Sequence, residues 1–298
     1  MFWIFPALGS YLSWAFLNII DKYAVTKRVK SPSVYYVWMV WLGLMVVVVI
    51  PFIDFYVPST NTLWWIFVAS GLYFFGSLLY LQAMKIEEVS RVNFWWNLIP
   101  LFTLLFAWLF LDEALNAREG LAFVILIAGA VVASLRFRDG SMLFSRALLW
   151  MIASTALYAL SYVAIRFIAQ DLPFLLASVW LDLALILWSF APFFLKRFRI
   201  LFAEEWRRLT PKLVGVVASA SFFDGLGKIL NVWAISLAAV ALVAALEGSQ
   251  SVFVFFLAVI ISVFAPRILK EELDRRNVMI KLIALALMAA GVAVLSFA

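Results

Sequence analysis

The sequence predicts an all-α integral membrane protein in which ten transmembrane helices form two inverted five-helix repeats. Hydrophobic residues make up 67% of the 298 positions and charged residues only 13%, a composition outside the range of soluble domains. The segment IAGAVVASL at 127–135 returns as AAGVAVLSF at 289–297, near the end of each half. Each half holds an odd number of apolar segments, so the second must enter the membrane from the opposite side.

Apolar windows account for nearly the whole chain. A helix needs about 20 apolar residues to cross the hydrocarbon core of a bilayer, and the backbone must satisfy its own hydrogen bonds there. Windows of that kind fall in succession near residues 3–21, 34–53, 63–84, 92–111, 119–135, 147–168, 173–195, 213–236, 239–264 and 278–297. The first five predict a domain at 1–140, and the other five predict a domain at 141–298.

The distribution of basic residues predicts the orientation. Twenty of the 23 Lys and Arg residues lie in the odd-numbered connections between the predicted spans. Basic residues near span ends are retained in the cytoplasm. We therefore expect a multi-pass protein of the cytoplasmic (inner) membrane with both termini on the extracytoplasmic side.

Composition also limits the chemistry. The chain has no cysteine and no histidine, which excludes disulfides, Cys/His metal sites and catalytic triads that contain histidine. No enzyme motif and no ATP-binding motif is present. The sequence predicts neither catalytic residues nor a metal, cofactor or nucleic-acid partner. The expected partners are a small-molecule substrate and the lipid bilayer.

Several motifs carry a resemblance to a known family. The segment PLFTLLFAWLFLDE at 100–113 combines a Pro, an Ala-Trp pair and a terminal Glu, and YLQAM at 80–84 precedes Lys85. Trp14 precedes Lys22 by eight residues, and a second acidic motif contains Glu271 and Glu272. These features resemble the EamA-like transporters of the drug/metabolite transporter superfamily. The resemblance implies an exporter of small metabolites, although members are usually drawn with both termini in the cytoplasm.

Four ionisable residues lie inside the predicted spans, and all of them are in the second half: Asp182, Asp224, Lys228 and Glu247. Such residues are costly in a membrane and normally face a cavity or a partner. Asp224 and Lys228 are four apart and share a helix face, either as a neutralising pair or as a pair that opens for substrate. Asp182 is the single charge of its span, either a carrier of a coupling proton or a structural cap.

A second candidate set joins the fourth and ninth spans. Asn93, Trp96 and Asn97 share one face of the fourth span, and Gln250 follows Glu247 by three residues on the ninth. The repeat alignment pairs Trp96 with Glu247 and Tyr73 with Asp224. An acid and an indole that face one pocket would suit an amine or zwitterion through charge and cation–π attraction. The alternative places the Trp residues in an aromatic belt and Glu247 in a structural hydrogen bond.

Three further features leave alternatives open. Asn18 in the first span is either a polar cavity residue or an interhelical bond. Phe198, Leu201 and Phe202 would share one face of a short helix in the headgroup layer, unless this connection is a solvated loop. Ala286 and Ala290 are small residues one turn apart, which allows tight helix packing or a homodimer.

Two functional hypotheses follow. The first is a secondary transporter that moves a small organic metabolite by alternating access. It would bind substrate through Glu247, Gln250, Asn93, Trp96, Asn97, Asp224, Lys228 and Asn18. Glu247, Asp182 and Asp224 are the candidates for proton coupling. The second is a flippase subunit that handles a lipid or a lipid-linked sugar, which requires a cavity open sideways to the bilayer.

Overall fold

The computed structural model describes residues 2–43, 50–111, 117–138, 141–238, 240–265 and 275–296. The helices are α1 (Ile4–Lys27), α2 (Pro32–Leu42), α4 (Thr60–Ile86), α5 (Val89–Trp96), α6 (Leu98–Leu111), α7 (Ala117–Ser134), α8 (Ala147–Asp171), α9 (Phe174–Ser189), α10 (Lys196–Trp206), α11 (Pro211–Leu237), α12 (Val240–Ala245), α13 (Glu247–Phe264) and α14 (Arg275–Ser296). Short 3-10 turns, η1 (Ile50–Phe52) and η2 (Ala191–Phe194), and strands β1 (Leu135–Arg138) and β2 (Ser141–Phe144) complete the described fold.

Local sequence explains where several helices begin. The Ser31 hydroxyl accepts a hydrogen bond from the Val34 amide, and Pro32 occupies the first turn of α2. Thr210 caps α11 in the same way, with Pro211 following it. A side-chain oxygen satisfies one of the free amides at a helix start, and proline is tolerated there because its missing amide would be unpaired anyway.

Several helices are long enough to cross a membrane. Among the described residues, five helices are long and apolar enough to cross a bilayer: Thr60–Ile86, Ala147–Asp171, Phe174–Phe194, Pro211–Leu237 and Glu247–Phe264. The protein is therefore a helical, multi-pass membrane protein. The count of ten spans stays a prediction. Glu113, Glu271 and Glu272 of the terminal acidic motifs lie outside the described residues.

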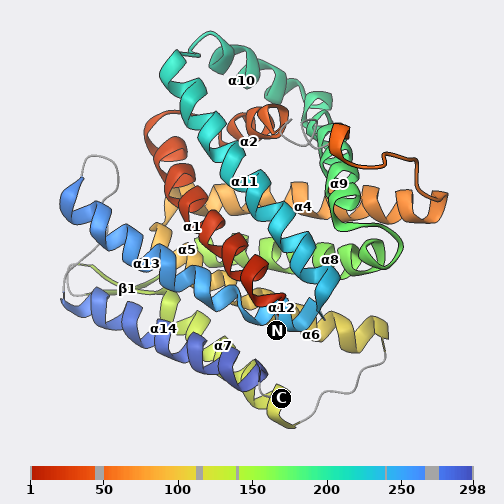
Figure 1. Cartoon of the computed structure of the whole chain (residues 1–298). Helices are drawn as coiled ribbons and strands as arrows, with labels where there is room; N and C mark the ends of the chain where they lie inside the picture. Colours follow the sequence, from red (N-terminus) through yellow and green to blue (C-terminus); the bar gives the residue numbers. More distant parts are fainter. Residues whose placement is uncertain are drawn as a thin grey trace.

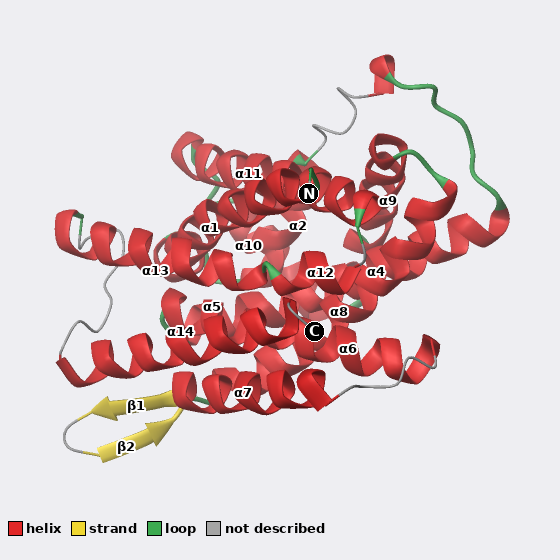
Figure 2. Ribbon diagram, turned by 60° about the horizontal axis from the view of Figure 1, so that its bottom comes forward, coloured by secondary structure: helices red, strands yellow, loops and turns green. Residues whose placement is uncertain are grey.

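Three details differ from the expected continuous spans. The fourth predicted span divides at Asn97 into α5 and α6, and the ninth divides at Leu246 into α12 and α13. Hydropathy does not detect such breaks, because the residues on both sides are apolar. The connection after α7 contains the antiparallel hairpin β1–β2, with Leu135 opposite Phe144. The hairpin lies beside α7 and α14 in Figure 2, and β1 contacts α14.

Corresponding helices of the two halves make corresponding contacts. The α1 helix packs along α11, and α8 packs along α4. In the same way α1 contacts α13, and α8 contacts α6. The last helices of the halves, α7 and α14, pack against each other along the lower part of Figure 1. The small residues Ala286 and Ala290 are exposed on the outside of this pair.

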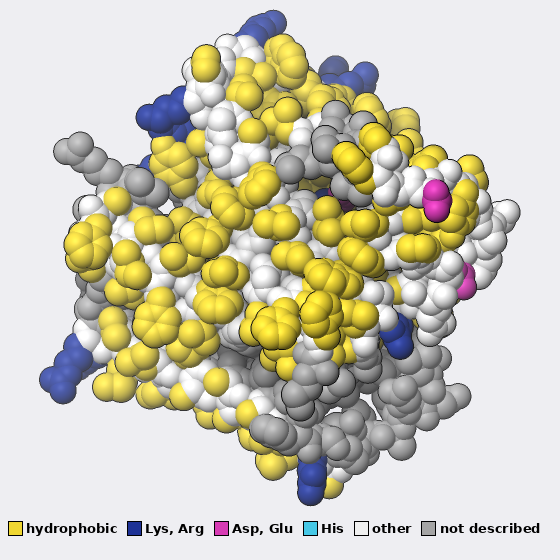
Figure 3. Space-filling view, viewed as in Figure 1, with side chains coloured by type: hydrophobic (Ala, Val, Ile, Leu, Met, Phe, Trp, Pro, Cys, Tyr) yellow, Lys and Arg dark blue, Asp and Glu magenta, His cyan; other side chains and the backbone are white. Residues whose placement is uncertain are grey.

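The outer surface is apolar. Hydrophobic side chains cover most of the face shown in Figure 3, whereas Lys and Arg lie towards its edges. Large apolar side chains on long helices stand outward, for example Leu149 on α8 and Leu187 on α9. The connection before α11 forms the helix α10, in which Phe198 is buried against Phe193 and Phe202. This outcome favours the short helix over an irregular loop.

Candidate functional site

A cavity of about 460 Å³ lies where α1, α2, α4, α5, α8, α11 and α13 meet. Seven of its 16 lining residues are aromatic: Trp14, Tyr36, Tyr73, Tyr80, Trp96, Tyr158 and Tyr162. Trp96 has its ring centroid 5.1 Å from that of Tyr80 and 4.9 Å from that of Tyr158. We call this space the central cavity.

Carboxyl groups enter the central cavity from three helices. Glu247 comes from the first turn of α13, Asp224 from α11 and Asp21 from α1, and all three are buried. Asp21 accepts hydrogen bonds from Tyr35 at 2.7 Å and from Tyr80 at 3.0 Å. The prediction that the second half supplies every ionisable group of the spans was therefore wrong. It failed because α1 continues to Lys27, beyond the predicted end of the first span.

Several buried polar atoms at the central cavity lack a hydrogen-bond partner. Two are acceptors, Glu247 Oε2 and Gln250 Oε1, and two are donors, the indole Nε1 atoms of Trp14 and Trp96. The Tyr36 hydroxyl is also unpaired. Buried polar groups are nearly always satisfied in folded proteins, so a convergent set of unpaired atoms marks a place for a ligand or water.

The amide residues of the predicted site have a bridging role. Asn18 donates through Nδ2 to Asn93 Oδ1 at 2.8 Å, and Gln250 donates through Nε2 to the same oxygen at 3.1 Å. Asn93 thereby links α1, α5 and α13 without lining the cavity. Asn97 lies at the α5–α6 break and donates to the Ser251 hydroxyl at 2.8 Å. The structure thus separates Asn93 and Asn97 from Trp96, which faces the central cavity.

A second cavity of about 450 Å³ adjoins the first. The two share Trp14, Tyr73 and Tyr162 in their walls, and the second also contains Asp182, Lys228 and Asn231. These three aromatic side chains therefore stand between the two spaces.

Charged groups form a triad at this boundary. Lys228 Nζ lies 2.6 Å from Asp182 Oδ1 and 3.1 Å from Asp224 Oδ2. The Tyr73 hydroxyl donates to Asp224 Oδ1 at 3.0 Å. Asp182 is therefore paired with a cation from the neighbouring helix α11. We call Asp182, Asp224 and Lys228 the charge triad.

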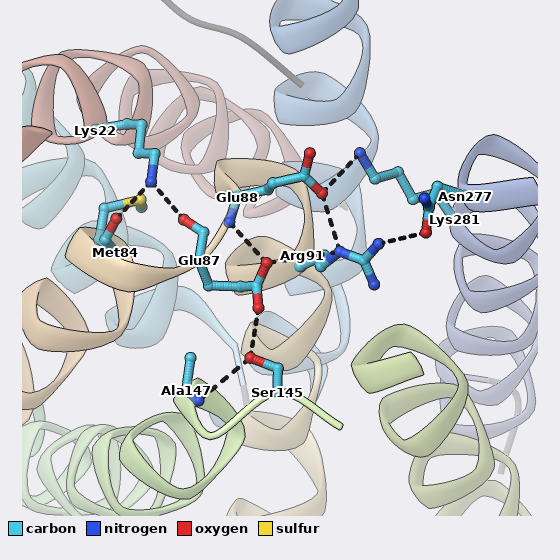
Figure 4. A network of polar contacts seen from close by, with 9 residues as sticks. All are labelled: Lys22, Met84, Glu87, Glu88, Arg91, Ser145, Ala147, Asn277 and Lys281. Atoms are coloured by element: carbon cyan, nitrogen blue, oxygen red, sulfur yellow. Dashed lines mark hydrogen bonds and ion pairs between the residues drawn. The ribbon is translucent and has the colours of Figure 1, made fainter. Parts of the chain in front are cut away.

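A further buried polar cluster lies at the turn between α4 and α5 (Figure 4). Arg91 is fully buried, with Nε 2.9 Å from Glu88 Oε2 and Nη2 2.9 Å from Asn277 Oδ1. Lys281 of α14 approaches Glu88 at 3.1 Å. Lys22 of α1 donates to the backbone oxygen of Glu87 at 2.5 Å. This α4–α5 cluster ties α1, α5 and α14 together.

Sequence reasoning missed the aromatic wall and this cluster. Tyr73 and Tyr80 are seven residues apart on α4, and Tyr158 and Tyr162 are four apart on α8, which puts each pair on one helix face. That spacing was the available signal. Lys22 and Arg91 were read as orientation signals, because their burial depends on partners from distant helices.

Residues that the internal repeat pairs also meet in space. Trp96 and Glu247 line the same cavity, and the Tyr73 hydroxyl touches Asp224. Equivalent positions of two halves approach each other only near an axis that relates the halves. The central cavity therefore lies between the two parts of the chain.

Comparison with known proteins agrees with the sequence motifs. Residues 1–135 match the model of the EamA-like transporter family. One solved crystal structure has the same fold, with a TM-score of 0.59 over 98% of this chain and 94% of that chain at 20% identity. A search of curated proteins gave no match. The family match indicates a membrane transporter rather than an enzyme, and the chain resembles the EamA-like transporters of the drug/metabolite transporter superfamily.

Proposed function

We propose that this protein is a secondary transporter that carries a small organic amine or amino acid across the cytoplasmic membrane. The observation that carries the proposal is the set of unpaired atoms in the central cavity, where Glu247 Oε2 and Gln250 Oε1 await a donor. The Nε1 atoms of Trp14 and Trp96 await an acceptor. An ammonium group would satisfy the first pair, and a carboxylate or hydroxyl the second.

The aromatic wall favours a cationic group. An ammonium ion within about 6 Å of a Trp or Tyr ring is attracted to the ring face, most strongly where water is excluded. Seven Trp and Tyr side chains surround the central cavity, and carboxyl groups from α1, α11 and α13 enter it. Among the described residues, no basic side chain lines this cavity, and Lys228 lines the second one.

Alternating access would exchange the two halves around this site. We place the boundary between the repeats at residues 140 and 141, and the paired contacts α1–α11 and α8–α4 support it. Carriers built from inverted repeats rock one half against the other around a fixed central site. The second cavity then provides a path from the central cavity towards the ends of α4 and α8 that face the extracytoplasmic side in our orientation.

Proton coupling, if present, would act through Glu247. Lys228 engages both Asp182 and Asp224, whereas Glu247 keeps one oxygen without a hydrogen-bond partner in the central cavity. A proton and a substrate ammonium would then compete for the same carboxylate. Uptake into vesicles with and without a pH gradient tests this step, and equal rates would remove it.

A thermal-shift screen of purified protein against amines, polyamines and amino acids tests the function itself. We expect wild-type protein to be stabilised by at least one compound that carries an ammonium group, and Glu247→Gln to lose that stabilisation. The matched control is Glu204→Gln on the exposed surface of α10. A compound that stabilises Glu247→Gln and wild type equally would exclude Glu247 from the site.

A further inference from the structure

An apolar groove on the surface, which shares no lining residue with the two cavities, lies between α2, the end of α10 and the start of α11. It has a volume of about 540 Å³ and is lined by Trp38, Trp41, Leu42, Trp206, Leu209, Val214 and Val217. Leu42, Val214 and Trp206 are exposed at its rim, which opens the groove outward. The groove therefore offers an apolar chain a place against the protein at the outer surface.

Basic side chains flank one end of this groove. Arg207 and Arg208 follow the lining residue Trp206, and Lys212 precedes the lining residue Val214. All three are exposed, and among the described residues none of them forms an ion pair. In Figure 3, Lys and Arg side chains border the upper edge of the molecule, the edge at which Figure 1 places α10.

One of the two neighbouring acids is turned away from this surface, whereas Glu204 is exposed. Glu205 is buried, and its Oε1 accepts hydrogen bonds from the backbone amides of Lys30 at 2.6 Å and Ser31 at 3.1 Å. These contacts hold α10 against the turn between α1 and α2. They also remove one negative charge from the neighbourhood of Arg207 and Arg208.

A polar atom inside the groove points to the kind of molecule that fits it. Trp38 lines the groove and is buried, and its indole Nε1 has no hydrogen-bond partner. An ester carbonyl oxygen would satisfy that donor. A basic cluster, an apolar groove and a free donor in its lining match the phosphate, acyl chain and ester of a glycerophospholipid.

We propose that this groove binds one anionic phospholipid, with an acyl chain along Trp38 and Val217 and the phosphate at Arg207, Arg208 and Lys212. Basic pockets beside transmembrane helices select anionic head groups, and each Lys or Arg near the membrane surface adds to that attraction. Trp side chains are enriched at the level of the head groups. The site is independent of the central cavity and of what that cavity transports.

The test compares two triple variants with equal charge change. Arg207→Gln/Arg208→Gln/Lys212→Gln removes the basic cluster at the groove, and Lys196→Gln/Arg197→Gln/Arg199→Gln removes the cluster at the other end of α10. Phosphatidylglycerol binding to purified protein is measured by native mass spectrometry, with phosphatidylcholine as the neutral lipid. We expect the groove variant to bind phosphatidylglycerol at least about tenfold more weakly, and the control variant to stay within about twofold of wild type. Equal losses in both variants would overturn the proposal. They would show that the lipid is held by general attraction of a basic helix to anionic lipid.

A second variant tests the acyl chain separately. Val214→Trp fills the groove and keeps every charge, so it should also release the lipid. Retention of phosphatidylglycerol by Val214→Trp, or full competition by free glycerol phosphate, would contradict a site that holds the chain. A stable dimer of delipidated protein in light scattering, unchanged by added phosphatidylglycerol, would show that a second copy covers the groove instead.

Discussion

At the residue scale, Trp14 of α1 lines both cavities. Its indole packs against a glycine. A Cβ atom on Gly227 would lie 2.4 Å from Trp14 Nε1, closer than any real contact allows, whereas a Cβ atom on Gly225 would meet open space. The indole therefore occupies the volume that a side chain at position 227 would need. Gly227 fixes the width of the site at this point.

Replacement of these two glycines should have opposite consequences. Gly227→Ala should push the Trp14 indole aside, lower stability by roughly 1–3 kcal/mol through overpacking and weaken ligand binding. Gly225→Ala should be neutral or slightly stabilising, because alanine favours a helix by about 1 kcal/mol over glycine. Thermal unfolding and ligand titration of the two variants measure both effects. Equal behaviour of the two variants would show that Trp14 does not depend on Gly227.

The charge triad permits a prediction about which member matters most. Lys228 neutralises two carboxylates whose side chains are only 11% and 10% exposed. Lys228→Met should therefore leave two buried acids without a cation, and it should cost about 3–5 kcal/mol of folding stability. Asp182→Asn leaves Lys228 paired with Asp224 and should cost clearly less. Adding Asp182→Asn to Lys228→Met should restore part of the loss; chemical unfolding that shows no such recovery would contradict the pairing.

At the element scale, the helices that build the site could be predicted in type but not in extent. Apolar composition predicts α4, α8, α9 and α11 well, because each is a continuous run. It does not detect the breaks at Asn97 and Leu246, since the residues around them are apolar. The Asn97 side chain bonds Ser251 of α13, a contact that composition cannot predict. Apolar composition also placed the end of the first span at residue 21, and Asp21 was not recognised as a site residue although Tyr35 and Tyr80 hold it in the interior.

The α4–α5 cluster should hold α5 and α14 together. Arg91 contacts Glu88 of its own segment and Asn277 of α14. Arg91→Met should remove the guanidinium from the buried Glu88 and lower stability by several kcal/mol. Lys85→Met is the matched control, because Lys85 is exposed and its Nζ donates to the backbone oxygen of Lys30. Comparable unfolding midpoints for the two variants would show that the cluster does not join these helices.

At the scale of the whole molecule, the absence of cysteine makes the orientation directly testable. The second connection contains Asn61 and the α10 helix contains Glu204, and both residues are exposed. Twenty basic residues lie on the odd connections, so those connections should face the cytoplasm and the second connection should face outward. Asn61→Cys should therefore react with a membrane-impermeant maleimide in intact cells. Glu204→Cys should react only after permeabilisation. The reverse pattern would place both termini in the cytoplasm.

The site as a whole was only partly accessible from the sequence. Glu247, Gln250, Trp96, Asp224 and Asn18 all line the central cavity, because a polar residue in an apolar helix needs a polar neighbour. The Tyr residues of the wall were missed, since tyrosine is ordinary in a membrane helix and its role depends on which helices meet. The two halves contribute both kinds of side chain, because Asp21 comes from α1 and Tyr158 and Tyr162 come from α8.

Direct binding to the central cavity tests the central claim most closely. Isothermal titration of the purified protein with the amine or amino acid found by screening should give one site per chain. Glu247→Gln should weaken its binding by at least about tenfold, the equivalent of 1.4 kcal/mol, and Glu204→Gln should leave it unchanged. Unchanged binding in Glu247→Gln, with Trp96→Ala also without effect, would contradict a substrate site in this cavity.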